Sequence, residues 1–344
     1  MALSARSLAA ALALAVPDPS FVTLRDADGR FVNPDGERPA GLGTVLRWSL
    51  WDRVTGKRRS SPDRAPVPFV QADPASLATP PAVGEPARVT WLGHASFLVQ
   101  LDGVSLLLDP ALREHIFPRI TRNVPPGLAL EALPPIDAAL VSHSHYDHLD
   151  LGTLERVKAP VVAGLGLKRF FEDEDLPATE LAWWETTTVK GVRITFVPAK
   201  HWSRRGPLDT NKTLWGGFVI EGSTATVYHS GDTAYFDGFA AIGRRFPGID
   251  LALLPIGAYD PAWFMEKQHM NPEQALQAFV DLGARTFVAM HWGTFKLTDE
   301  PLDEPPARLA AERTRLGLPE ERVRVPAVGE TLTAARPDPA GDGR

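Results

Sequence analysis

Cysteine is absent from this chain of 344 residues, and its absence excludes several kinds of chemistry. A protein without thiols forms no disulfide, has no cysteine nucleophile and holds no metal through sulfur. Any metal ligand must therefore be a nitrogen or an oxygen atom. The redox compartment stays open, because a chain without cysteine suits reducing and oxidising surroundings equally.

An excess of positive charge is also missing, since 36 lysine and arginine residues stand against 42 aspartate and glutamate residues and give a net charge of −6. Nucleic-acid-binding proteins usually carry a basic surface, so we expect no nucleic acid among the partners. The hydrophobic content of 44% is ordinary for a folded globular protein with a sizeable core. One domain with extensions fits this length.

The apolar run at residues 8–16 is too short for a transmembrane helix, which needs about 20 residues. Arg6 precedes this run, and residues 1–16 therefore resemble a short secretion signal. An alanine-rich helical arm explains the same residues equally well. The location stays open between the cytoplasm and, if residues 1–16 act as a signal, the periplasm, with membrane association as a further option.

Residues 17–86 are rich in proline, glycine, arginine and aspartate, and we predict an extended arm that wraps around the domain. Within this arm, Trp48 and Trp51 precede the basic run Lys57-Arg58-Arg59. Tryptophan beside lysine and arginine suits a peripheral membrane contact. The alternative is a short helix that docks its tryptophans onto the core.

Residues 87–325 are predicted to form the ordered domain, because strand and helix patterns alternate there as in α/β proteins. Strands are predicted at residues 89–92, 96–101, 104–109, 160–163 and 285–290, with further strand runs from Val192, Trp215, Ala225 and Leu251, and helices at residues 149–157 and 165–171. Another helix begins at Pro272, with Asn271 as its cap. Residues 326–344 are predicted to be a flexible tail.

The octet from His143 to Asp150 places three imidazoles, of His143, His145 and His148, beside the carboxylate of Asp147. It directly follows the apolar run 136–142, so it lies where a buried strand ends. Histidine is the commonest ligand of borderline divalent metals, and zinc takes three or four such groups. One turn cannot supply every ligand of the site, so the remaining ligands must come from elsewhere in the chain.

His201, Asp232 and His291 are the downstream candidates, because each follows an apolar, strand-like run. Isolated histidines in a chain of this length are usually solvated or satisfied core residues. Chance does not readily produce a motif with three partners that all lie where sheets end and ligands bind. We therefore expect four strand ends to meet at one rim and form a metal site.

The hexapeptide at residues 143–148 resembles the signature of the metallo-β-lactamase superfamily. That resemblance implies an α/β fold, the four-layer αββα sandwich, with a dinuclear metal site at the edges of its two sheets. Further blocks resemble the family of N-acyl-phosphatidylethanolamine-hydrolysing phospholipases D, at residues 91–94, 109–110, 211–216, 231–235, 255–259, 263–265, 268–269 and 291–295. The similarity extends over about residues 89–316 and leaves out the N-terminal arm and the C-terminal tail.

The resemblance implies which residues hold two zinc ions. One ion would be held by His143, His145 and His201, the second by Asp147, His148 and His291, and both by Asp232. Two such metals would stabilise a bridging hydroxide for in-line attack on phosphorus. Other divalent metals remain an option, because nitrogen and oxygen sites follow metal availability as well as affinity.

Asp109, His269 and Asp232 are the expected catalytic residues by the same resemblance. Asp109 would orient a ligand histidine or receive a proton from water, although a simple strand-end cap before Pro110 is the alternative. His269 would donate to a phosphoryl oxygen or to the leaving group, unless it is only a histidine fixed in a turn. His94 is expected to pack beside the site without binding metal.

Three functions follow from this reading of the sequence. The first is a dizinc phosphodiesterase that acts on a phospholipid-like or other phosphodiester substrate. The second is a dizinc hydrolase of another class, a lactonase or a carboxylic ester hydrolase. The third is a metal-binding scaffold without catalysis, which a complete set of shared ligands does not favour. A homo-oligomer is compatible with each of them.

Overall fold

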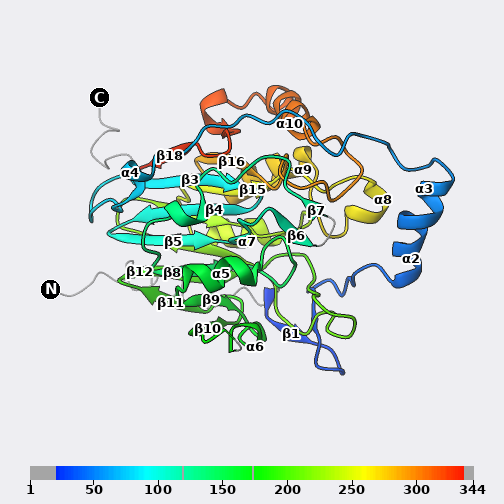
Figure 1. Ribbon diagram of the computed structural model, residues 1–344, viewed down its shortest axis with the longest axis horizontal. Coiled ribbons are helices and arrows are strands. Elements are labelled where there is room, and N and C mark those ends of the chain that lie inside the picture. Colours follow the sequence, from blue (N-terminus) through cyan, green and yellow to red (C-terminus); the bar gives the residue numbers. More distant parts are fainter. Residues whose placement is uncertain (1–20, 118–119, 173, 337–344) are drawn as a thin grey trace.

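The computed structural model describes residues 21–117, 120–172 and 174–336 (Figure 1). The signal-like segment expected at residues 1–16 and the last part of the expected tail, residues 337–344, lie outside the described residues. Two seven-stranded sheets form the body of the molecule. Within the described ranges, no helix is both long and apolar enough to cross a bilayer.

The first sheet has the strand order β10-β9-β8-β5-β4-β3-β18. Its strands are β3 (Ala87–Gly93), β4 (Ser96–Leu101), β5 (Val104–Leu108), β8 (Ala138–Val141), β9 (Val161–Gly164), β10 (Ala178–Leu181) and β18 (Thr331–Ala334). Strands β3, β4 and β5 are antiparallel neighbours, whereas β5, β8, β9 and β10 are parallel. The carboxyl ends of β3, β5 and β8 therefore lie at the same edge of the sheet.

The second sheet has the order β11-β12-β13-β14-β15-β16-β17. Its strands are β11 (Thr186–Val189), β12 (Val192–Val197), β13 (Gly217–Glu221), β14 (Thr226–His229), β15 (Leu251–Pro255), β16 (Thr286–Met290) and β17 (Val323–Arg324). Strands β11 to β14 alternate in direction, and β14 to β17 are parallel. The carboxyl ends of β12, β14 and β16 consequently share an edge.

The two sheets pack face to face over one core. Phe97 of the first sheet and Phe196 and Phe218 of the second are fully buried in the same apolar cluster. Helices α5 (Leu151–Val157) and α6 (Arg169–Glu172) cover the outer face of β8 and β9, and α4 (Pro74–Leu77) covers that of β4 and β5. Helices α7 (Gly238–Arg245), α9 (Pro272–Leu282) and α10 (Glu304–Arg315) cover the second sheet. The four-layer αββα sandwich is thereby confirmed.

Helix α9 begins where the sequence predicts it. The Asn271 side chain accepts a hydrogen bond from the backbone of Gln274, and the Gln274 side chain accepts one from the backbone of Asn271. This capping box satisfies two backbone donors that the first turn of a helix leaves free. The remaining short elements are β6 (His115–Phe117), β7 (Ile120–Thr121), η3 (Leu130–Ala132), α8 (Ala262–Met265) and η4 (Glu320–Arg322).

The N-terminal arm contains more regular structure than expected. It holds β1 (Leu24–Arg25), β2 (Phe31–Val32), α2 (Leu42–Leu46), the π-helix η2 (Arg47–Trp51) and α3 (Asp52–Val54). Phe31 is fully buried in the main core, and the indole of Trp48 stacks on Phe264 at 5.1 Å between ring centroids. Arg58 donates from Nε to Asp299 over 2.8 Å, and Arg59 from Nη1 to Glu304 over 2.9 Å. These contacts attach the arm to the body.

Two expectations about the ends of elements are wrong. The helix expected at residues 165–171 is confined to α6, because Gly166 has φ +87° and its Cβ position would lie 2.7 Å from the carbonyl oxygen of Lys212. The flexible tail expected from residue 326 begins too early, since β18 pairs with β3 over four residues and Val328 is fully buried. The sheet therefore continues beyond the predicted boundary at residue 325.

Candidate metal centre

The expected ligands meet where the carboxyl edges of the two sheets face each other. Residues 143–148 follow β8 of the first sheet, whereas His201, Asp232 and His291 follow β12, β14 and β16 of the second. The rim is thus shared by two sheets, and each ligand loop starts at a strand whose residues are buried. The direction of the strands brings residues distant in sequence to one place.

His143, His145, His201 and Asp232 form the first ligand group, with donor atoms within 4.8 Å of one another. Nδ1 of His145 lies 2.8 Å from Nε2 of His143 and 3.2 Å from Nε2 of His201. Oδ2 of Asp232 lies 4.0 Å and 3.8 Å from the same two Nε2 atoms. Donors about 2.0–2.1 Å from a tetrahedral zinc are separated by roughly 3.3–3.4 Å, so this spacing suits one ion.

Asp147, His148 and His291 surround a second position, and Asp232 reaches it as well. Nε2 of His148 lies 3.2 Å from Oδ2 of Asp232 and 3.7 Å from Oδ2 of Asp147. Nε2 of His291 lies 3.0 Å from Oδ1 of Asp232 and 3.7 Å from Oδ2 of Asp147. The Asp232 carboxylate therefore faces both positions, an arrangement compatible with the shared ligand that the family resemblance implies.

The hydrogen bonds of the outer ring nitrogens indicate which nitrogen is free to bind a metal. Nδ1 of His148 donates to Oδ2 of Asp109 over 2.7 Å, and Nδ1 of His201 donates to the carbonyl oxygen of Gln268 over 2.8 Å. In its neutral form an imidazole carries one N–H, so Nε2 of each neutral ring keeps its lone pair. These lone pairs point into the two positions, and such partners orient ligand histidines in metal sites.

The charge balance and the unsatisfied polar atoms also fit a bound cation. Nε2 of His148, Nε2 of His291 and Oδ1 of Asp232 are buried without a hydrogen-bond partner among the described residues. Burial opposes ionisation of Asp232, but the neighbouring His148 and His291 hold its pKa well below the usual value. Burial lowers the pKa of His143 and His201 well below the usual value. Burial opposes protonation of His148 and His291, but Asp232 raises the pKa of His148 well above the usual value and that of His291 to about 9. A metal ion bound here would replace the protons of these two rings and leave neutral imidazoles beside an ionised carboxylate, which is the donor set that Zn²⁺ takes.

Asp109 lies behind the ligands and is fully buried. Its Oδ1 accepts from the backbone N–H of Ser142 over 2.7 Å, and its Oδ2 accepts from Nδ1 of His148 and from the Ser142 hydroxyl, each over 2.7 Å. Of the two roles expected for this carboxylate, the geometry supports the orientation of a ligand histidine. Contact with the reacting atoms is not supported, and we treat Asp109 as a positioning residue.

The backbone at the rim is held in conformations that are uncommon for side-chain-bearing residues. His94, Asp109 and His291 have φ values of 55°, 39° and 60°, and such outliers concentrate at functional sites. Gly231, just before Asp232, has φ +59°, and a Cβ there would lie 2.6 Å from the carbonyl oxygen of Gly216. Only glycine allows the turn that brings Asp232 between the two groups.

His269 lies at the mouth of the centre. Its side chain is 12% exposed and that of Asp147 is 13% exposed, whereas His143, His148, His201 and His291 are at most 1% exposed. Nδ1 of His269 lies 3.9 Å from Oδ2 of Asp232 and has no hydrogen-bond partner among the described residues. Burial lowers the pKa of this ring to about 4, so it is neutral near pH 7.

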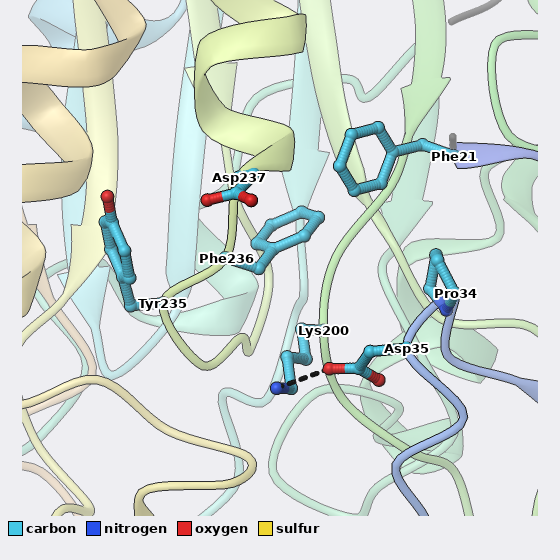
Figure 2. Close-up of a pocket in the computed structure, with 7 residues that line it drawn as sticks. All are labelled: Phe21, Pro34, Asp35, Lys200, Tyr235, Phe236 and Asp237. Carbon is cyan, nitrogen blue, oxygen red and sulfur yellow. Dashed lines mark ion pairs between the residues drawn. The ribbon is translucent and has the colours of Figure 1, made fainter. Parts of the chain in front are cut away.

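The N-terminal arm fixes the loop that carries His201. Nδ2 of Asn33 donates to the carbonyl oxygen of His201 over 2.8 Å. Nζ of Lys200 lies 2.6 Å from Oδ2 of Asp35 (Figure 2). The same atom lies 3.0 Å from Oε2 of Glu37. Glu37 also pairs with Lys267 over 2.8 Å, close in sequence to His269. One short piece of the arm thus holds two loops of the centre in place.

Sequence reasoning missed some residues at the centre. Ser142, which links Asp109 to the motif, and Asn33 were not expected. For Ser142 the only signal was its position at the end of the apolar run, directly before His143. Nε2 of His94 lies 2.9 Å from Oδ2 of Asp147, which fits an outer partner, although the ring also groups with Asp147, His148 and His291. His115 lies on the exposed strand β6. Nε2 of His229 donates to the carbonyl oxygen of Ala95 over 2.9 Å.

Comparison with known proteins gives a consistent result. Residues 105–292 match the family described as the β-lactamase superfamily domain. The chain is 37% identical to an uncharacterised protein of Mycobacterium tuberculosis, in a match that covers 83% of this chain and 78% of that protein. It is 34% identical to a metal-dependent hydrolase of Opitutus terrae, over 71% of this chain and 99% of that protein.

Two further similarities concern activity and fold. The chain is 38% identical to N-acyl-phosphatidylethanolamine-hydrolysing phospholipase D 1 of Caenorhabditis elegans, over 64% of this chain and 68% of that protein. A metallo-β-lactamase fold protein of Bacillus subtilis superposes with a TM-score of 0.53 at 21% identity, over 73% of this chain and 100% of that protein. At this identity the structural likeness concerns the fold alone.

Proposed function

This chain belongs to the β-lactamase superfamily and is a metal-dependent hydrolase, and we propose that it is a dizinc phosphodiesterase for phospholipid-like substrates. The observation that carries the proposal is the Asp232 carboxylate, which faces two adjacent groups of ligand atoms and lies 3.9 Å from His269. A single metal would need only one of the two groups. The worm relative named as a phospholipase D supports the substrate class.

Some side chains would bind the metal ions, and others would hold these ligands in position. His143, His145 and His201 would bind one ion, Asp147, His148 and His291 the other, and Asp232 both. Two divalent cations in such a site lower the pKa of water and stabilise the charge of an in-line displacement at phosphorus. Asp109 accepts the proton of Nδ1 of His148, and the carbonyl oxygen of Gln268 accepts that of His201. In the neutral form of each ring, Nε2 is therefore the atom that would bind the metal.

His269 would act on the substrate from the mouth of the centre. Its neutral ring has one N–H to donate, and Nδ1 has no partner among the described residues. A phosphoryl oxygen at the mouth of the centre, within reach of His269, would receive that hydrogen bond. The buried ligand side chains exclude water on the other sides, which strengthens each of these interactions.

The first experiment measures metal content and hydrolysis on the same preparation. We expect about two zinc ions per chain, with cleavage of both N-acyl-phosphatidylethanolamine and a chromogenic phosphodiester. His145→Ala should lose metal and activity together, and Asp232→Asn should lose activity. His115→Ala is the matched control, because His115 lies on an exposed strand outside the centre.

The other outcomes identify the alternatives. Zinc-loaded protein that hydrolyses lactones or carboxylic esters but no phosphodiester would refute the substrate class and leave the metal centre intact. Zinc-loaded protein that is inert toward all three classes would indicate a metal-binding scaffold. A single tightly bound zinc would contradict the role of Asp232 as a shared ligand.

A further inference from the structure

An apolar strip lies on the outside of the N-terminal arm. Helices α2, η2 and α3 follow one another without a break and project from one end of the molecule (Figure 1). Leu46, Leu50, Trp51 and Val54 are 45%, 59%, 62% and 85% exposed. Leu46, Leu50 and Val54 are four residues apart, about one helical turn, and Trp51 follows Leu50, so the four side chains lie on one broad side. These four residues are called the apolar strip below.

The opposite side of the same segment is firmly attached to the body. Nε1 of Trp48 donates to Asp299 over 3.1 Å, and its ring stacks on Phe264 of α8. The side chain of Asp52 is buried. The segment is therefore a docked helix with two different faces, and the outward face is the apolar one. Single exposed apolar residues are ordinary on protein surfaces, but contiguous ones mark interaction sites.

Cationic side chains surround the strip. Arg47, Arg53 and Lys57 are exposed on or beside it, and the guanidinium of Arg47 lies 4.3 Å from the ring centre of Trp263 in α8. Next to α3, an open cavity of about 530 Å³ is lined by Arg53, Arg58, Arg59 and Lys296 together with Asp63 and Asp299. Arg47 pairs with Asp52 over 3.7 Å, Arg58 with Asp299 and Arg59 with Glu304. Arg53 and Lys57 have no ion pair among the described residues, so their positive charges are available on this surface although the whole chain carries a net charge of −6.

We propose that this surface docks the enzyme on a lipid bilayer that contains anionic lipids. The apolar strip would enter the boundary between head groups and acyl chains, and Arg47, Arg53 and Lys57 would lie among the head groups. This is the arrangement of amphipathic helices that lie in the plane of a membrane. Tryptophan favours the same boundary because its ring is apolar and its N–H is polar.

A second copy of the chain is a less suitable occupant of the strip. A stable dimer usually buries about 800 Å² on each partner. Four side chains hide at most several hundred Å², since even a large aromatic side chain contributes roughly 150–250 Å². Binding to a bilayer does not need this area, because electrostatic attraction adds to the apolar contact. Each cation near an anionic surface strengthens binding about fivefold.

Membrane docking does not depend on the proposed phosphodiesterase activity. It is measured as binding to vesicles that contain no N-acyl phospholipid. The probes are vesicles of equal parts phosphatidylcholine and phosphatidylglycerol, compared with vesicles of phosphatidylcholine alone. Leu50→Glu with Trp51→Glu should lower binding to the anionic vesicles by about a hundredfold or more. Arg53→Gln with Lys57→Gln should lower it about 25-fold and leave binding to neutral vesicles unchanged.

Val83→Glu is the matched control. Val83 is 74% exposed and lies between α4 and β3, and α4 is at the end of the molecule opposite to α2 and α3 (Figure 1). This variant should bind vesicles like the wild type. Thermal unfolding and zinc content should be the same for all variants, which shows that fold and metal centre are intact whether or not a phosphodiester is cleaved.

Two results would overturn the proposal. One is a wild-type protein that does not bind the anionic vesicles, or binds them no better than the variant with Leu50→Glu and Trp51→Glu. The other is a wild-type dimer that the same variant converts to monomer in the absence of lipid, with vesicle binding unchanged. The second result would assign the strip to a contact between copies of the chain.

Discussion

Replacing Asp109 by asparagine should empty one metal position and leave the other occupied. Asp109 is fully buried, and its Oδ2 accepts the proton of His148 Nδ1 over 2.7 Å. In the variant, the amide oxygen can still accept from the backbone of Ser142, but the amide N–H₂ then faces His148. A donor opposite a donor favours the tautomer in which Nε2 of His148 carries the proton, and that nitrogen can no longer bind a metal.

The expected magnitude follows from the loss of one such partner. Replacing the hydrogen-bond partner of a ligand histidine lowers metal affinity or activity about 10- to 100-fold, which corresponds to about 1.4–2.7 kcal/mol. In a titration at buffered free zinc concentrations, the zinc affinity of the second binding step should therefore be lower. The first step should change less, because His145 and His201 make no hydrogen bond to Asp109 and His143 is linked to it only through the Ser142 hydroxyl.

Asp250→Asn is the control for the general effect of removing a buried carboxylate. Oδ2 of Asp250 accepts from the backbone of Thr226 over 2.8 Å. This bond lies at the amino ends of β14 and β15, at the sheet edge opposite to the metal centre. This variant should lose stability but keep both zinc affinities. If Asp109→Asn bound two zinc ions as tightly as the wild type, or lost both equally, the assignment of Asp109 to His148 would be refuted.

Three further predictions test other parts of the centre. His269→Ala should lower turnover by about a hundredfold or more with zinc content unchanged, and loss of zinc in that variant would make His269 a ligand. Gly231→Ala should destabilise the fold by about 1–3 kcal/mol in urea denaturation, because its φ is +59° and its Cβ would meet Gly216; an unchanged midpoint would contradict this. The hydrogen bond from Lys267, together with Lys200, lowers the pKa of Glu37. The stabilisation by these ion pairs is therefore fully present above the ordinary carboxyl pKa, and it is lost as the pH falls through the lowered pKa. The melting temperatures of Glu37→Gln and wild type should therefore differ near neutral pH and converge in acid, and a constant difference would show that the charge of Glu37 is not involved.

The elements that carry ligands are predictable from the sequence because their signals are local. The apolar run before His143 is a strand, and Asn271 caps α9 as expected. His201, Asp232 and His291 each follow a strand, and parallel strands bring their carboxyl ends together whatever the loops between them contain. Residue type and strand end were sufficient to group the expected ligands.

The elements and contacts that were missed depend on partners distant in sequence. β18 has only four residues, and it is a strand because it pairs with β3, more than two hundred residues earlier in the chain. The helix expected at residues 165–171 has apolar residues at suitable positions, but the carbonyl oxygen of Lys212 lies against Gly166. The bond between Asn33 and the carbonyl oxygen of His201 spans 168 positions. Periodicity contains no information about such pairs.

The pairing of β18 with β3 has a consequence for the nascent chain. β3 is among the first strands of its sheet to be synthesised, and β18, which covers its edge, is the last. Until β18 emerges from the ribosome, β3 presents free backbone N–H and C=O groups along a strand in which six of seven residues are buried in the finished protein. Open apolar edges of this kind pair with other chains. By pairing with β3, β18 thus closes an edge through which the unfinished sheet could aggregate.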